Sequence, residues 1–469
     1  MAATLKNRAD RYEHGRELRT RVPREAHAEL HGPRDRDAVA ILAESDAERV
    51  PALLPERYKR MMVDPFGFLR GAAAVMATDL AHQPLAGAPV QACGDCHLMN
   101  FGAFNSPEDS ILFDINDFDE TLPGVDFTVD VKRLAASVAV AAKAANMSDK
   151  RARSLAASTV GAYREHMFAL MDLSPLEIWH SRIDLEQELK QIESPSLRRG
   201  LSGVIRHAQA VGLDRDDNFP HLVTGREPRI ADKPPTIFHI DAKTLGGRKI
   251  DFTRGFELYR ETLTPDRTVL LDRYRLTDVA FKAVGVGSVG TICVVGLFLN
   301  GDGEPLFLQV KQAQRSVLER LSPKLAYQGP QGRRVVEGQR MMQAASDIFL
   351  GWTTDEPLGI DFYVRILKNR RLGGVSELAE QEALSEYARL CGRTLARSHA
   401  RTGDSAVIAG YMGRNGVFDD ALGSFAMAYV EQTIKDHAAL VTAKGGAKAE
   451  AAPKAAKLAR KPKRVRKSA

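Results

Sequence analysis

The sequence predicts an α+β protein in which a mainly helical part is combined with an antiparallel sheet. Three observations predict this class. Apolar residues recur at helical spacing through much of residues 61–233, residues 236–311 are rich in Val, Ile, Thr and Phe with Gly and Asp at turns, and helical spacing returns from residue 332. Because 469 residues exceed what one hydrophobic core usually serves, we expect two lobes with a cleft between them.

Each element follows from its own pattern. Residues 1–60 are Arg-rich with short apolar periods, which predicts loosely packed helices, whereas residues 300–303 (NGDG) between two apolar runs predict a β-hairpin. Helices are predicted over 66–80, 125–145, 150–173, 185–212, 332–350, 376–400 and 417–443, and strands over 111–113, 306–311 and 362–367.

The predicted organisation has five parts. They are an Arg-rich helical segment (1–60), a helical lobe (61–233), a sheet-rich lobe (234–370), helices that return to the helical lobe (371–443), and a disordered basic tail (444–469).

The basic tail accounts for the net charge. From Lys444 onward there are ten Lys and Arg against one acid, Glu450, so the tail has a charge of +9. Because the net charge of the whole chain is +6, the rest of the chain has a charge of −3. Its Ala, Lys and Pro cannot bury a core, which predicts disorder. Such a tail either contacts nucleic acid or other polyanions weakly or is simply a solvated tail, and the sequence favours neither.

The chain lacks the marks of a membrane or secreted protein. No apolar run approaches the roughly 20 residues that a bilayer span requires, and the N-terminus carries charges where a signal peptide needs an apolar stretch. The four cysteines do not form a disulfide pattern. We therefore expect a cytoplasmic protein with reduced thiols and no membrane span.

The segment GDCHLMN, residues 94–100, is the first candidate for chemistry. An Asp followed five residues later by an Asn can fold as one turn, with the carboxylate of Asp95 facing a substrate hydroxyl and the amide oxygen of Asn100 facing a metal. Phosphoryl transfer requires this combination of a group that orients the nucleophile and a ligand for the metal. His97 lies between them as a further candidate.

Four acids in seven positions, Asp114, Asp117, Asp119 and Glu120, follow at the end of an apolar strand. Carboxylates this close repel one another unless a cation is present, which indicates Mg²⁺ or Mn²⁺. The period of a strand places Asp117 and Asp119 on one side. A lone Gly-Asp or Asp-x-Asp is more often a turn with a solvated carboxylate, and the proximity of the two segments favours the functional reading.

A glycine-rich stretch, VGVGSVGT at residues 284–291, lies between two β-branched runs and so resembles a phosphate-covering hairpin more than a dinucleotide fold. After the next hairpin an apolar strand ends in Lys311, which could bind nucleotide phosphates or lie at a sheet edge facing water. Its expected helical partner is Glu337, with Glu319 as the nearer alternative. The nucleotide-binding candidates are thus Gly285, Gly287, Ser288, Gly290, Lys311 and Glu337.

These motifs resemble those of the protein kinase and aminoglycoside phosphotransferase superfamily. GDCHLMN is similar to its catalytic loop, HGDLHPGN in the phosphotransferases, and INDFDE to its metal-binding strand. The resemblance implies ATP and Mg²⁺, with Asp95 as base, Asn100 and Asp117 as metal ligands and Asp119 as a possible second ligand. Asp130 resembles the aspartate that braces the catalytic loop from the following helix.

The order of the motifs departs from that superfamily, because its glycine loop and lysine precede the catalytic loop and here they follow it. The resemblance therefore implies a circular permutation of a two-lobed, kinase-like fold. Residues 390–399 support this, since they are similar to the helix that normally runs directly into the catalytic loop. Chain ends that lie close in space make such a rearrangement feasible.

Residues 15–440 also resemble a bacterial family known as domain of unknown function 2252. The resemblance rests on four stretches, RYKRMMVDPFGFLRGAAAVMATDLA (57–81), CGDCHLMNFGAF (93–104), FDINDFDET (113–121) and VVEGQRMMQAASDIFLGW (335–352). It implies no activity, so function rests on the motifs.

Three functions are consistent with the sequence. The first is an ATP-dependent phosphotransferase that acts on an unknown small-molecule or protein hydroxyl. The second is a phosphoesterase in which Asp95, His97, Asp114, Asp117 and Asp119 hold two metals, with no use for Lys311. The third is a non-catalytic nucleotide-binding protein.

Overall fold

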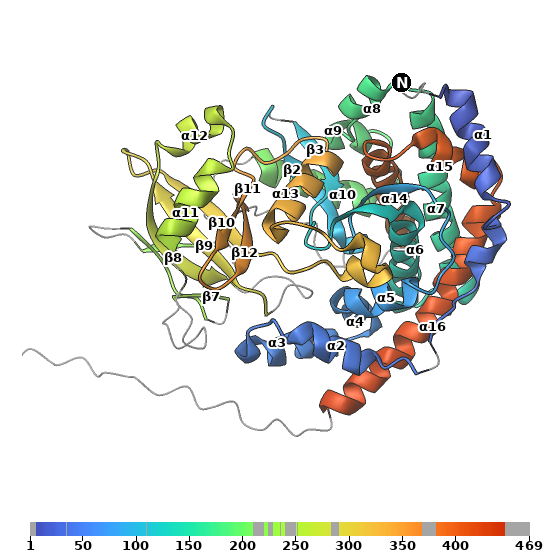
Figure 1. Ribbon diagram of the computed structural model, residues 1–469, viewed down its shortest axis with the longest axis horizontal. Helices are drawn as coiled ribbons and strands as arrows, with labels where there is room; N and C mark the ends of the chain where they lie inside the picture. Colours follow the sequence, from blue (N-terminus) through green and yellow to red (C-terminus); the bar gives the residue numbers. More distant parts are fainter. Residues whose placement is uncertain are drawn as a thin grey trace, which may run out of the picture.

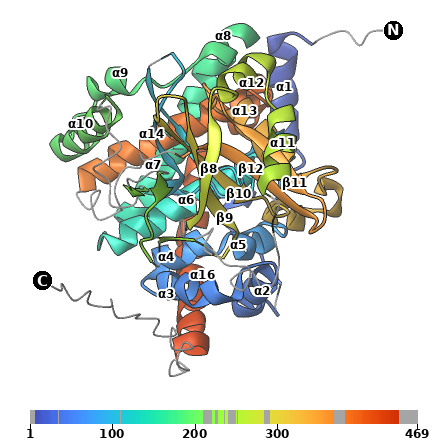
Figure 2. The same ribbon diagram turned by 90° about the vertical axis from the view of Figure 1, so that its left-hand side faces the viewer.

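The computed structural model confirms the α+β class (Figure 1). It describes residues 6–33, 35–108, 110–209, 220–223, 228–234, 236–239, 250, 252–282, 290–367 and 381–445. The large sheet lies on one side of the molecule and the long helices on the other. Figure 2 looks onto the sheet, with the long helices behind it.

Four long helices form the centre of the helical part, and they are α6 (Phe127–Ala144), α7 (Asp149–Met171), α14 (Gln381–Ala400) and α16 (Val417–Gly445). Their alanines and glycines allow close packing. A Cβ atom on Gly392 of α14 would lie 2.4 Å from the carbonyl oxygen of Thr159 on α7, so only glycine fits there. The core of the protein lies between these helices, whose lengths largely agree with the predicted periods.

The N-terminal region contains α1 (Arg8–Leu18), α2 (Ala38–Asp46), α3 (Leu54–Met61), α4 (Pro65–Gly71) and α5 (Ala73–Leu80). The single helix predicted over 66–80 is wrong, because the chain leaves helical geometry at Ala72 (φ −112°, ψ 36°). Two arginines stabilise this break. Arg133 donates to the carbonyl oxygen of Leu69, and Arg57 donates to that of Gly71.

The large sheet has six antiparallel strands in the order β11-β12-β10-β9-β8-β7. The strands are β7 (Ile237–Phe238), β8 (Arg275–Lys282), β9 (Cys293–Leu299), β10 (Pro305–Gln312), β11 (Gly351–Asp355) and β12 (Ile360–Ile366). The hairpin predicted at residues 300–303 joins β9 to β10, and Gly303 there has φ +80°. Lys311 therefore lies on an interior strand, and the edge-strand alternative is wrong.

The two faces of the sheet differ in polarity. Register pairs Lys311 with Tyr363 and Gln309 with Arg365, which gives one polar face. The opposite face is apolar and packs beneath α11 (Phe252–Glu261), where Tyr259 is buried. Helix α11 and the following α12 (Pro265–Leu271) were not predicted, because residues 236–311 were read as sheet alone.

Two small antiparallel strand pairs flank the segment that contains Asp95. Strand β1 (Pro89–Ala92) pairs with β4 (Leu122–Asp126), and β2 (Phe101–Asn105) pairs with β3 (Ile111–Ile115), so residues 93–100 connect the two pairs.

The other helices are α8 (Pro175–His180), α9 (Leu185–Leu189), α10 (Pro195–Gln209), α13 (Gln331–Met342) and α15 (Ser405–Met412), and β5 (Leu222–Val223) pairs with β6 (Arg229–Ile230). Short 3-10 turns cover Arg24–Ala28, Pro51–Leu53, Leu98–Asn100, Val317–Leu321 and Pro323–Leu325. Within the described ranges, no helix is long and apolar enough to cross a bilayer.

Candidate functional site

The loop that carries Asp95 is held from below by the first turn of α6. The carboxylate of Asp130 accepts hydrogen bonds from the backbone N–H of Cys93 at 2.6 Å and of Gly94 at 2.9 Å. Gly94 has φ +91°, and a Cβ atom there would lie 2.3 Å from the carbonyl oxygen of Glu120. The sharp turn before Asp95 thus depends on a glycine and on two charge-assisted hydrogen bonds.

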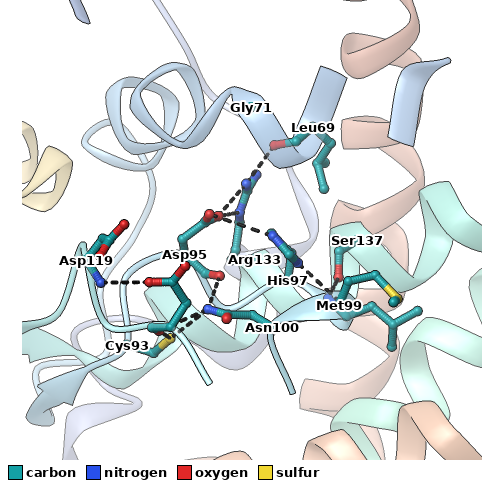
Figure 3. A network of polar contacts seen from close by, with 12 residues as sticks. Leu69, Gly71, Cys93, Asp95, His97, Met99, Asn100, Asp119, Arg133 and Ser137 are labelled. Atoms are coloured by element: carbon teal, nitrogen blue, oxygen red, sulfur yellow. Dashed lines mark hydrogen bonds and ion pairs between the residues drawn. The ribbon is translucent and has the colours of Figure 1, made fainter. Parts of the chain in front are cut away.

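Asp95 is oriented by an arginine from the same helix. Arg133 donates to Asp95 Oδ1 from Nη2 at 2.6 Å and from Nε at 3.0 Å, while its own side chain is almost fully buried (Figure 3). The Asp95 side chain keeps 20% of its surface exposed. One carboxylate oxygen is therefore fixed by Arg133, and the group still reaches the cleft.

His97 supports this loop as a neutral imidazole. Burial lowers the pKa of His97 to about 4, a shift that Asp95 opposes and the charges of Arg70 and Arg133 reinforce. Its Nδ1 accepts a hydrogen bond from the backbone N–H of Met99 at 3.2 Å, so the proton is on Nε2, which lies 3.8 Å from Asp95 Oδ2. His97 therefore lies beside Asp95 as a neutral side chain.

Asn100 ties the loop to the acidic segment. Its side-chain Nδ2 donates to the carbonyl oxygens of Asp95 at 3.0 Å and Asp117 at 3.1 Å. Both bonds engage the amide nitrogen, which leaves the amide oxygen of Asn100 as the atom that could accept a cation. The side chain is 5% exposed and lines the cleft.

Lys311 meets the acidic segment from the sheet. Its Nζ lies 3.7 Å from Asp117 Oδ2 and forms a close ion pair with Asp119, whose other oxygen accepts a hydrogen bond from the Tyr363 hydroxyl at 2.8 Å. Burial opposes a charge on Lys311, but the two carboxylates outweigh it and raise the pKa of Lys311. Residues from two distant parts of the chain are thus brought together.

Asp114 and Glu337 lie apart from this cluster. Asp114 is fully buried and accepts from Arg397 Nη2 at 2.6 Å and from the backbone N–H of Ala344 at 2.9 Å. Glu337 lies on the outer face of α13, where it pairs with Arg333 at 2.7 Å. The structure therefore does not bring Glu337 to Lys311.

Part of the glycine-rich stretch can be placed. Gly285, Gly287 and Ser288 lie outside the described residues, whereas Gly290 has φ +100° and its carbonyl oxygen accepts from the backbone N–H of Val50 at 2.7 Å. The next residue, Thr291, lines the cleft.

A cleft of about 1030 Å³, a volume that includes open solvent at its mouth, lies between the Asp95 loop and the acidic segment. Its lining includes Asp95, His97, Asn100, Asp117, Asp119, Glu120 and Thr291. The sequence predicts no role for Glu120 beyond its place in the acidic run. Burial raises the pKa of Glu120 to about 7, although the Val317 N–H and Arg334 act in the opposite direction. At neutral pH this carboxyl is therefore partly protonated.

Several residues of the site were not predicted from the sequence. They are Arg133, which fixes Asp95, Tyr363, which donates to Asp119, and Arg334, whose Nη2 donates to the carbonyl oxygen of Asp119 at 2.8 Å. For Arg133 a signal existed, because it follows Asp130 by three residues and so lies on the same face of α6.

The cleft offers oxygen ligands of the kind that Mg²⁺ prefers. In the part of the chain that the structure describes, no three His, Cys, Asp or Glu side chains are grouped so as to hold a metal by themselves. A magnesium ion that arrives with a nucleotide needs only one or two carboxylates, because phosphates and water complete its shell. Asn100 and Asp117 fit that requirement.

The comparisons with known proteins identify a family. No curated protein and no solved structure matches the chain. One family model matches residues 49–443, a stretch that contains Asp95, the acidic cluster and Lys311. This match confirms the family resemblance drawn from the sequence. The chain therefore belongs to the family described as "Uncharacterized protein conserved in bacteria (DUF2252)".

Proposed function

We propose that the protein is an ATP-dependent phosphotransferase with a kinase-like, circularly permuted fold, and that its acceptor carries a hydroxyl group. The observation that carries the proposal is the contact of buried Lys311 with Asp117 and Asp119, two acids that line the cleft together with Asp95 and Asn100. A lysine from a sheet, a carboxylate and amide for the metal, and a fixed aspartate are the groups that phosphoryl transfer requires.

Each group has a separate role in this proposal. Asp95, fixed by Arg133, orients the acceptor hydroxyl and takes its proton. Lys311 binds the nucleotide phosphates, and Asn100 and Asp117 hold the magnesium ion, with Asp119 as a further ligand. When bound, the ion neutralises charge on the transferred phosphoryl group. In the ligand-free protein the ammonium of Lys311 neutralises the same carboxylates.

The permuted order is supported by the path of the last helices. His399 near the end of α14 contacts Asp130, the residue that holds the Asp95 loop, so the C-terminal helices pack against the catalytic segment. The proposal departs from kinases at one point. Lys311 pairs with Asp119, and the helical glutamate that would be its partner, Glu337, faces outward.

The phosphoesterase alternative receives less support. Its ligand set requires Asp114 and His97 to coordinate metals, but Asp114 is bonded to Arg397, and His97 uses Nδ1 for the Met99 N–H and directs Nε2 toward Asp95. That hypothesis also gives no role to the buried Lys311.

Nucleotide binding and turnover test the proposal together. Mg-ATP should raise the Tm of the wild-type protein by several degrees, because a ligand at 100 times its Kd stabilises the folded state by about 2.7 kcal/mol. Asp95→Asn should keep this shift but lose ADP release by about a hundredfold or more. Asp149→Asn, at an exposed helix start, serves as the control. Absence of any Tm shift with Mg-ATP in the wild type would refute the proposal.

A further inference from the structure

Three arginines from the N-terminal region line the same cleft as the catalytic residues, and the proposed function gives them no role. They are Arg49, which follows α2, Arg57 in α3 and Arg70 in α4, and together we call them the arginine wall. Helices α2 and α3 lie at the lower edge of the molecule in Figure 1 with α4 above them, and α3 contacts α4.

Arg57 is built into this wall. Its side chain is 1% exposed, its Nη2 donates to the carbonyl oxygen of Gly71 at 2.8 Å, and its Nη1 lies 3.1 Å from Asp46 Oδ1. The remaining nitrogen, Nε, is buried without a hydrogen-bond partner in the structure. A buried guanidinium with an unused donor next to a cleft is suited to an anion that enters the cleft.

Arg49 shares Asp46 with Arg57. The Arg49 Nε lies 3.6 Å from Asp46 Oδ1, and the side chain packs against Gly290, the last glycine of the glycine-rich stretch. Burial and the charge of Arg57 lower the pKa of Arg49 to about 10, so it remains a cation at neutral pH. Two buried cations therefore converge on one carboxylate at this end of the cleft.

Arg70 lines the cleft together with Asp95. It belongs to the last turn of α4, whose carbonyl oxygens at Leu69 and Gly71 are held by Arg133 and Arg57. Arg133, which donates to the carbonyl oxygen of Leu69, also donates to Asp95, so the end of α4 that carries Arg70 lies close to the Asp95 loop. The wall thus runs from the glycine-rich stretch to the residue that should receive the acceptor hydroxyl.

We propose that the arginine wall binds a phosphate group on the acceptor, so that the substrate is a phosphorylated compound with a free hydroxyl. This inference rests on the proposed phosphotransferase function. Guanidinium groups bind phosphate in a bidentate, charge-assisted manner, and three of them match a group with several oxygens and about two negative charges. Lys311 and the metal ligands already serve the nucleotide phosphates, whereas Arg70 lies on the side of Asp95.

Titration calorimetry with inorganic phosphate at constant ionic strength tests the wall. Phosphate should bind the wild-type protein, and the dissociation constant should rise about tenfold or more in Arg70→Gln and Arg49→Gln, because each change removes charge-assisted hydrogen bonds. Arg60→Gln, on α3 but outside the cleft lining, should bind phosphate like the wild type. Arg57 stays intact because its ion pair with Asp46 supports the fold.

A second titration in saturating Mg-ATP distinguishes the acceptor from the nucleotide. Phosphate should still bind, and Arg70→Gln should change the Mg-ATP dissociation constant by less than about twofold. If Mg-ATP excludes phosphate, the wall serves the nucleotide and the inference is wrong. If phosphate binds neither form while Mg-ATP binds, the inference fails and the phosphotransferase proposal stands. If Mg-ATP does not bind at all, both fail.

Discussion

The imidazole Nε2 of His399 lies 3.2 Å from Asp130 Oδ2, although 269 residues separate the two in the chain. Both side chains are fully buried, and the Tyr163 hydroxyl bonds His399 Nδ1 at 2.9 Å. Asp130 in turn accepts from the backbone of Cys93 and Gly94. The end of α14 is thus linked through one carboxylate to the loop that carries Asp95.

Replacement of Asp130 should weaken both the fold and the site. Asp130→Asn removes the charge from a group that accepts three hydrogen bonds, so we expect the free energy of unfolding to fall by about 2–4 kcal/mol. Urea unfolding measures this. Asp149→Asn, in an exposed pair with Lys143, should cost less than about 1 kcal/mol. Equal stability of the two variants would contradict the bracing role of Asp130.

Substitution of Gly94 should destabilise the protein more than substitution of another glycine with positive φ. Gly94→Ala adds backbone strain at φ +91° and a Cβ atom 2.3 Å from the carbonyl oxygen of Glu120, so the loop must shift. We expect a loss of about 2 kcal/mol or more, with loss of ADP release.

Gly303→Ala separates the two effects. Gly303 has φ +80° and no atom within 4 Å of the added Cβ, so only the strain of roughly 1 kcal/mol should appear. If both variants lose the same stability in urea unfolding, the close approach to Glu120 is unimportant.

Local patterns were sufficient to predict the turn that contains Asp95 and Asn100. Asp95 and Asn100 lie in one turn, and the apolar run of residues 306–310 after a hairpin turn predicts the strand of Lys311. These features depend on neighbours in sequence, so the sequence contains them. Helix α11 was missed because its aromatic residues favour strands by propensity, although their spacing is helical.

The contacts that site residues make with residues distant in the chain could not be predicted from the sequence. Four acids close together in sequence do not reveal which of them face the cleft. Asp114 does not line the cleft, because its carboxylate accepts a hydrogen bond from Arg397, which is distant in the chain. Likewise Arg334 lies on the inner face of α13, where it donates to the main-chain oxygens of Asp119 and Thr121, whereas Glu337 lies on the outer face of the same helix. Such choices are made by tertiary packing.

Lys311→Met should abolish the Tm shift produced by Mg-ATP. The change removes the cation proposed to bind phosphate and leaves Asp117 and Asp119 to repel an anionic ligand. Because these carboxylates keep 28% and 25% of their surface exposed, we expect only about 1–2 kcal/mol of lost stability, so the variant should fold. Lys324→Met at an exposed position is the control. An unchanged Mg-ATP shift in Lys311→Met would remove Lys311 from the nucleotide site.

Glu120 should make the stability of the folded protein depend on pH. The pKa of Glu120 is about 7 in the folded protein, mainly because of burial, against 4.5 for an ordinary glutamate. Between these two values the folded state keeps a proton that the unfolded state has lost. The stabilising contribution of this proton is therefore fully present below about pH 4.5 and is lost as the pH rises through 7.

Glu120→Gln should remove this dependence. Glutamine keeps an oxygen that can accept from the Val317 N–H, which the native carboxylate binds at 2.7 Å, but it never ionises. Relative to wild type, we expect Glu120→Gln to gain about 2 kcal/mol of unfolding free energy at pH 8 and to show little change at pH 4.5. Urea unfolding at both pH values measures the difference. Glu337→Gln, in a half-exposed pair with Arg333, should change stability by less than about 0.5 kcal/mol at either pH. If the gain of Glu120→Gln does not grow with pH, the carboxyl is already ionised in the folded protein, and an anionic ligand entering the cleft meets its full negative charge.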